Sequence, residues 1–252
     1  MTLQLIRNAT LKLTFAEHTI LVDPFFAPKH GIESFAGRER NPILDLPMDV
    51  EAIVADVDLI LVTHTHADHF DASAILELPK RIPLFYQKAD QAKFMEWPFE
   101  QATMIEDTVE WSGITITRTG GQHGRGPILD HMGTVSGFVL QAEGEPTIYI
   151  VGDSVWVPEA ADVIKQYAPD IIVTNSGGAI MPGFEDTPIL MDAMETLEVS
   201  KARPEATIIA VHLEALDHCP VSRESVKTVF AEAGRSDKLY VPEDGEAIVL
   251  KA

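Results

Sequence analysis

The order of apolar and polar residues along the chain predicts short strands and helices in mixed order. Two strands, Leu11–Phe15 and Thr19–Val22, open the pattern and are joined by a short turn. The apolar run Asp58–Thr63 is typical of a buried strand. The next segment, Asp71–Leu78, favours a helix, because Asp71 can cap its first turn.

The rest of the chain continues this mixture of strands and helices. Strands are predicted over Leu84–Tyr86, Ser136–Gln141, Thr147–Val151, Asp170–Thr174 and Thr207–Val211, with two more between Thr103 and Thr119 and a last hairpin over Lys238–Lys251. Helices are predicted over Lys88–Met95, from Pro158 to about Tyr167, and across Val226, Val229, Phe230 and Ala233 up to Gly234. A further predicted helix has Leu190, Met194 and Leu197 on one face. This mixture indicates one layered domain of the α/β or α+β class over residues 1–252.

One long segment has no regular pattern. Residues 26–49 contain several prolines and glycines and no clear apolar period. Loops of this length are uncommon inside compact domains and are often functional, so the segment is a candidate for shaping a site.

Composition places the chain among globular proteins and narrows its partners. Of the 252 residues, 46% are hydrophobic and 23% are charged, which excludes collagen-like and disordered classes. The formal net charge of −20 argues against nucleic acid and against an anionic membrane surface as partners. The oligomeric state stays open, with a homo-oligomer as one option.

Cysteine content and the amino-terminal sequence suggest a compartment. The lone Cys219 can form no internal disulfide and excludes a cysteine-rich zinc site. No signal peptide and no long apolar span stand out, so we expect a cytoplasmic protein.

The strongest chemical signal is the segment from His64 to His69, which directly follows a predicted buried strand. In an extended chain, residues i and i+2 point the same way, so His64 and His66 can reach one metal ion. Asp68 and His69 follow where the chain turns, and can serve a neighbouring ion. Imidazole and carboxylate ligands suit zinc first, with manganese or iron as alternatives.

Five more residues near predicted strand ends join this hypothesis. His123, Asp153 and His212 each follow a strand and are candidate metal ligands. His218 is an alternative to His212; if His212 is the ligand, His218 becomes a substrate-contacting group, such as a general acid for the leaving atom, or a structural histidine. Asp23, after an early strand, is a candidate to hold a ligand histidine from behind.

Together these residues resemble the metallo-β-lactamase-fold superfamily of metal-dependent hydrolases. The match consists of one motif and three later positions, in the order His64-x-His66-x-Asp68-His69, His123, Asp153 and His212. Ile20–Pro24 is similar to the branch that includes ascorbate-6-phosphate lactonase and, nearby, N-acylphosphatidylethanolamine phospholipase D.

This resemblance implies an α+β fold, a four-layer αββα sandwich, with two divalent metal ions at one edge. It implies one ion held by His64, His66 and His123, and a second held by Asp68, His69 and His212, with Asp153 bridging the two.

The function expected from this site is a metal-dependent hydrolase. A metal-bound hydroxide would cleave a small ester, lactone or phosphodiester, with Asp68 and His218 as catalytic residues. The expected substrate is then a small molecule. If it is anionic, arginines such as Arg7 and Arg223 could supply the opposite charge. A di-iron redox protein of the same fold and a non-catalytic metal-binding protein remain the alternatives.

Overall fold

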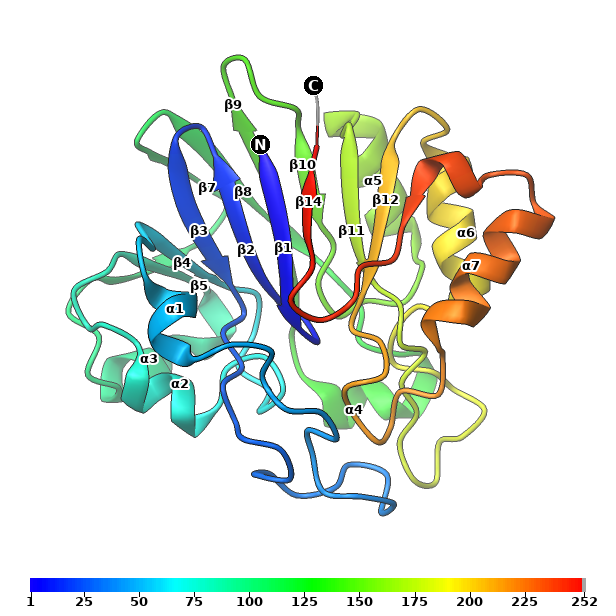
Figure 1. The fold of residues 1–252 in the computed structure, drawn as a ribbon, viewed down its shortest axis with the longest axis horizontal. Coiled ribbons are helices and arrows are strands. Elements are labelled where there is room, and N and C mark those ends of the chain that lie inside the picture. The colour runs from blue at the N-terminus through cyan, green and yellow to red at the C-terminus, as the bar shows by residue number, and fades with distance from the viewer. Residues whose placement is uncertain (251–252) are drawn as a thin grey trace.

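Two seven-stranded sheets form the centre of the molecule (Figure 1). This computed structural model describes residues 1–250. In spatial order, the first sheet contains β14 (Ala247–Val249), β1 (Thr2–Arg7), β2 (Thr10–Phe15), β3 (His18–Val22), β4 (Leu59–Val62), β5 (Leu84–Gln87) and β6 (Ala102–Ile105). The second contains β13 (Leu239–Tyr240), β12 (Thr207–Val211), β11 (Ile171–Asn175), β10 (Ile148–Ile150), β9 (Ser136–Ala142), β8 (Ile114–Gly120) and β7 (Thr108–Trp111).

Strand periodicity decides which residues fill which layer. In β4, Leu59 and Leu61 point into the core between the sheets, whereas Ile60 and Val62 point to the outer face. Both faces of such a strand are buried, which explains why its sequence is a continuous apolar run.

Helices cover the outer faces of both sheets. The first sheet packs against α1 (Val50–Val54), α2 (Ala72–Glu77) and α3 (Gln91–Glu96), and the second against α5 (Pro158–Tyr167), α6 (Ala193–Ala202) and α7 (Arg223–Glu232). The short α4 (Leu129–Met132) and the 3-10 turns η1 (Lys88–Asp90), η2 (Gly126–Ile128) and η3 (Ser236–Lys238) lie in connections. This is the predicted αββα sandwich. No helix within residues 1–250 is long and apolar enough to cross a membrane.

Most of the local expectations are confirmed. Asp71 caps α2 through bonds from the backbone N–H groups of Ser73 and Ala74, and α5 spans Pro158–Tyr167 as expected. Residues 26–49 contain no helix or strand, only an isolated bridge between Ile32 and Asn41.

Near the chain ends, one expected hairpin is wrong and one strand was missed. The hairpin over Lys238–Lys251 does not form: β13 pairs with β12 in the second sheet, while β14 pairs with β1 in the first, and Lys251 itself lies outside the described residues. Strand β1, which pairs with both β14 and β2, was missed. Its alternating start, with Leu3 and Leu5 buried and Gln4 less so, is short and ends on the buried but charged Arg7.

Two expectations within the chain are also wrong. The segment from Thr103 to Thr119 forms three strands, and β6 closes one sheet before β7 and β8 begin the other. Helix α6 starts only at Ala193, after its N-cap Asp192, so Leu190 precedes it and Met194 is 55% exposed. Only Leu197 of that predicted face is buried in the helix.

Candidate metal centre

One edge of the sandwich gathers the histidines and aspartates that follow the strands. Strands β3 to β6 run parallel, as do β10 to β13, so their carboxyl ends open on common edges. The polar residues after these strands therefore meet, together with the long irregular connections at the bottom of Figure 1. The structure brings all seven predicted ligands into this cluster: His64, His66, Asp68, His69, His123, Asp153 and His212.

The cluster divides into two groups. The potential ligand atoms of His64, His66 and His123 lie within 4.8 Å of one another. The same limit holds for the second group, which comprises Asp68, His69, Asp153 and His212. These are the two sets that the sequence resemblance implied.

Asp153 lies between the two groups. Its Oδ2 is 3.2 Å from His69 Nε2 and 3.5 Å from His123 Nε2. The same oxygen is 3.8 Å from His64 Nε2, and Oδ1 is 3.9 Å from His212 Nε2. One carboxylate thus faces histidines of both groups, as a bridging ligand must.

A surrounding shell of hydrogen-bond partners orients the histidine rings. Asp23 Oδ2 accepts from His69 Nδ1 at 2.8 Å, and the Ile189 carbonyl oxygen accepts from His123 Nδ1 at 2.8 Å. The Thr63 hydroxyl lies 3.0 Å from His64 Nδ1 and donates to Asp23 at 2.6 Å. In His64, His69 and His123, Nδ1 is engaged outside the cluster, so Nε2 is the nitrogen that faces inward. His66 differs, because its Nδ1 lies 3.0 Å from His64 Nε2.

Electrostatics in the cluster keep the carboxylates ionised. Burial opposes ionisation of Asp153, but the neighbouring histidines, His69 first, hold the pKa of Asp153 well below its usual value. Burial is likewise outweighed at Asp68, whose pKa is lowered by the neighbouring His212, with its Nε2 3.4 Å from Asp68 Oδ2, and by His69. Burial would lower the pKa of His69, yet Asp153 and Asp23 raise it well above the usual value. Two buried anions therefore face the inward nitrogens, which suits a cation.

Unpartnered buried atoms test whether this donor set fits a metal. Among the described residues, His69 Nε2 and His212 Nε2 are buried side-chain atoms without a hydrogen-bond partner. A buried polar atom without a partner is costly, and a divalent cation would remove that cost. The five imidazoles and two carboxylates of the cluster are ligands that zinc, manganese and iron accept. The residues present therefore fit a metal.

The choice between His212 and His218 follows from their positions. His212 is fully buried, and its Nε2 lies 3.4 Å from Asp68 Oδ2. The His218 ring centroid is 6.5 Å from that of His212, and its side chain lines the adjoining pocket. His212 thus belongs to the cluster, and His218 lines the pocket beside it.

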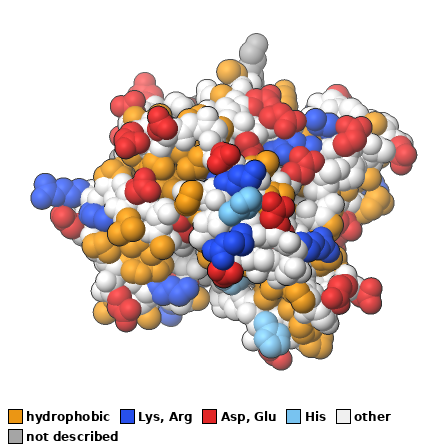
Figure 2. Space-filling view, turned by 60° about the horizontal axis from the view of Figure 1, so that its bottom comes forward, with side chains coloured by type: hydrophobic (Ala, Val, Ile, Leu, Met, Phe, Trp, Pro, Cys, Tyr) orange, Lys and Arg blue, Asp and Glu red, His pale blue; other side chains and the backbone are white. Residues whose placement is uncertain are grey.

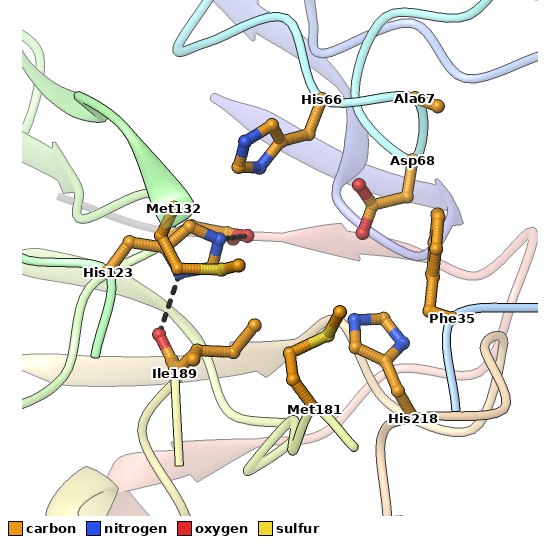
Figure 3. Close-up of a pocket in the computed structure, with 10 residues that line it drawn as sticks. Phe35, His66, Ala67, Asp68, His123, Met132, Met181, Ile189 and His218 are labelled. Atoms are coloured by element: carbon orange, nitrogen blue, oxygen red, sulfur yellow. Dashed lines mark hydrogen bonds and ion pairs between the residues drawn. The ribbon is translucent and has the colours of Figure 1, made fainter. Parts of the chain in front are cut away.

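A small, mostly apolar pocket leads to the cluster. Its volume is about 170 Å³. Figure 3 shows Phe35 beside His218, with Met132 and His123 on the opposite side. Besides cluster residues and His218, the lining consists of Phe35, Ala67, Met132, Met181 and Ile189. No lysine or arginine of the described residues lines this pocket.

The arginines considered for substrate binding are engaged elsewhere. Arg223 pairs with Glu214 and Asp244, and the buried Arg7 donates to the carbonyl oxygens of Leu44, Phe25 and Ala27. Figure 2 shows the molecule with the bottom of Figure 1 turned forward, and basic and acidic side chains lie next to each other on that face.

Several site residues were missed from the sequence. Asn175 ends β11 and donates to Asp153 Oδ1 at 2.6 Å, and its position at the end of a parallel strand could have identified it. Gly177 lets its own backbone lie close to that of His212, because a Cβ at Gly177 would lie 2.4 Å from the His212 carbonyl oxygen. Phe35 comes from residues 26–49, the segment expected to shape a site, but neither Phe35 itself nor Met181 was identified from the sequence.

Two facing sheets, outer helices and a buried His/Asp cluster at one edge define the class: metal-dependent hydrolases with the metallo-β-lactamase fold. The sequence profile of the beta-lactamase superfamily domain matches residues 18–213, and the chain belongs to this family.

Similar proteins extend over the whole chain. The UPF0173 protein YddR of Bacillus subtilis (strain 168) is 38% identical, over 96% of this chain and 97% of its own. A crystal structure of a possible metal-dependent hydrolase from Veillonella parvula DSM 2008 has 37% identity and a TM-score of 0.95, covering 99% of both chains. That of isothiocyanate hydrolase from Delia radicum gut bacteria has 36% identity and a TM-score of 0.93, covering 100% of both.

Proposed function

We propose that the cluster holds two divalent metal ions and that the protein hydrolyses a small, neutral, apolar molecule with an electrophilic carbon. The observation that carries the proposal is the apolar pocket, which ends on the His/Asp cluster and has no basic side chain in its lining. Beyond the metal ions themselves, such a lining offers no lysine or arginine to pair with the negative charge of an anionic phosphodiester, so it favours an uncharged ester, lactone or isothiocyanate. The isothiocyanate is included because one similar protein is an isothiocyanate hydrolase.

The ligand assignment in this proposal follows the two groups of the cluster. His64, His66 and His123 would hold one ion, and Asp68, His69 and His212 the other, with Asp153 between them. Zinc is the first choice, with manganese or iron as alternatives. When bound, such ions polarise the electrophile and activate water near neutral pH.

The chain's own groups would position the reactants. Asp68 lines both the cluster and the pocket, so its carboxylate can accept a hydrogen bond from the attacking water. His218 faces the same pocket from the other side (Figure 3). Burial lowers the pKa of His218 to about 4, so its neutral ring can donate a hydrogen bond to the heteroatom that gains a proton. Phe35, Met181 and Ile189 would enclose the substrate's hydrocarbon part and exclude bulk water.

Turnover of matched neutral and anionic substrates tests the proposal. Metal-loaded protein is expected to hydrolyse phenyl acetate, a small lactone or benzyl isothiocyanate, and to leave bis(p-nitrophenyl) phosphate nearly untouched. A chelator and His66→Ala should each abolish turnover, because both remove the metal. His18→Gln is the matched control, since His18 begins β3 at the opposite end from Asp23.

Hydrolysis of only the phosphodiester would refute the substrate class. Protein that carries iron, absorbs visible light and hydrolyses none of these compounds would favour the redox alternative instead.

A further inference from the structure

The segment from Ser34 to Glu39, here called the strap, contributes Phe35 to the pocket wall and is held by one carboxylate. Asp217, directly before His218, is only 8% exposed. Its two oxygens accept hydrogen bonds from the backbone N–H groups of Phe35, Ala36, Arg38 and Glu39, from the Ser34 hydroxyl and from the Asn41 amide. The strap contains no helix or strand, so these bonds are its main backbone contacts.

The strap's backbone is shaped for an anion. Successive N–H groups that converge on one point form a concave anion-binding nest, and a residue with positive φ is part of such a turn. Gly37 has a φ of +71° and is the strap residue between the two pairs of donating N–H groups. The hydrogen bonds from Ser34 and Asn41 outweigh burial and hold the pKa of Asp217 below its usual value, so the anion is present at neutral pH.

This anchor determines where Phe35 lies. The N–H group of Phe35 is bound at 3.0 Å to Asp217, and its ring centroid lies 4.9 Å from that of His218, edge to face. Phe35 also packs beside Leu216 and Ala215 from the chain just before Asp217. Figure 3 shows Phe35 and His218 side by side at the pocket wall.

We infer that Asp217 is a positioning residue for substrate selection: it anchors the strap so that Phe35 forms one wall of the pocket and packs against His218. This inference rests on the proposed function, because Phe35 would be the pocket wall that contacts the apolar part of the proposed substrate. Asp217 itself does not line the pocket.

Limited proteolysis tests the anchor without any enzymatic turnover. Arg38 and Arg40 offer trypsin sites in and beside the strap. Asp217→Asn replaces one acceptor oxygen by an amide donor that faces the N–H donors of the strap. In this variant we expect trypsin cleavage after Arg38 and Arg40 to accelerate at least tenfold. Asp58→Asn is the matched control, because Asp58 accepts one backbone bond from Thr19 at the far end of β4 and should leave cleavage unchanged. Equal cleavage of the wild-type protein and Asp217→Asn would overturn the inference.

Binding of two alkanethiols to metal-loaded protein tests the wall, again without turnover. The thiolate can coordinate metal, so the chain-length dependence of binding reports on the apolar pocket. The two additional CH₂ groups of butane-1-thiol over ethanethiol should tighten wild-type binding roughly 15-fold, since a buried CH₂ contributes ~0.8 kcal/mol. In Asp217→Asn and Phe35→Ala this ratio should fall below about fivefold, and the double variant should lose no more than either single one.

The outcomes separate this inference from the proposed function. Asp217→Asn that is merely less stable, with an unchanged thiol ratio, would overturn the positioning role. Wild-type protein that binds neither thiol would refute the metal of the proposed function, and the proteolysis result alone would then decide whether Asp217 anchors the strap. If Asp217→Asn fails to fold, Ser34→Ala removes one donor and should show the same changes at smaller size. Wild-type protein that shows the predicted cleavage and thiol ratios but hydrolyses no substrate would refute the proposed function alone.

Discussion

Asp23 offers the most informative single change to the cluster, because it holds a ligand histidine without entering the site. Its Oδ1 accepts from the Thr63 N–H at 2.7 Å, and its Oδ2 accepts from the Thr63 hydroxyl at 2.6 Å and from His69 Nδ1 at 2.8 Å. In Asp23→Asn an NH₂ group can replace Oδ2. That group would donate to His69 Nδ1 and leave the ring proton on Nε2, the nitrogen that faces Asp153.

The expected cost is in metal affinity rather than in folding. Loss of such an outer partner typically costs 10- to 100-fold in metal affinity or activity, which corresponds to about 1.4–2.7 kcal/mol. Competition with a fluorescent chelator measures the affinity directly. Asp170→Asn is the control, since Asp170 accepts one backbone bond from Thr147 away from the cluster. A metal affinity of Asp23→Asn within threefold of wild type would refute the reasoning.

Three further predictions follow from the same structure. His66→Ala and Asp153→Ala should each lose metal, measured by elemental analysis, while circular dichroism shows a retained fold, because both lie at the edge of a large core; normal metal content in both would contradict the site. Phe138→Ala, between the sheets and fully buried, should lower the free energy of unfolding by about 3–5 kcal/mol in urea titrations; a loss below about 1 kcal/mol would contradict the packing. The pKa of Asp217 is depressed in the folded state, so the ionised Asp217 stabilises the fold above its unfolded pKa, and this contribution is lost as pH falls. Between about pH 5 and 3, the free energy of unfolding of the wild-type protein should therefore drop more steeply than that of Asp217→Asn. Parallel pH curves for the two proteins would contradict this sign.

The sequence predicted the cluster well because its residues follow strands. A buried strand such as β4 is readable as an apolar run, and the polar residues after it, His64 onward, must then lie at a sheet edge. The same reasoning located His123, Asp153 and His212, although it left His212 and His218 undecided. Their difference in burial and position depends on tertiary packing.

The pocket and the chain ends were not predictable in this way. Phe35 and Met181 come together from two irregular segments about 150 residues apart in sequence, and no local pattern records that contact. Strands β13 and β14 are adjacent in sequence but join different sheets, because each pairs with a distant partner rather than with its neighbour. Long-range pairing of this kind leaves no trace in periodicity.

Metal stoichiometry tests the central claim most directly. Protein purified without chelator, or reconstituted with zinc or manganese, should contain close to two ions per chain by mass spectrometric elemental analysis, and His66→Ala should contain fewer. Two groups of ligand atoms joined by Asp153 predict this value. Wild-type protein that holds no metal after reconstitution would contradict the account.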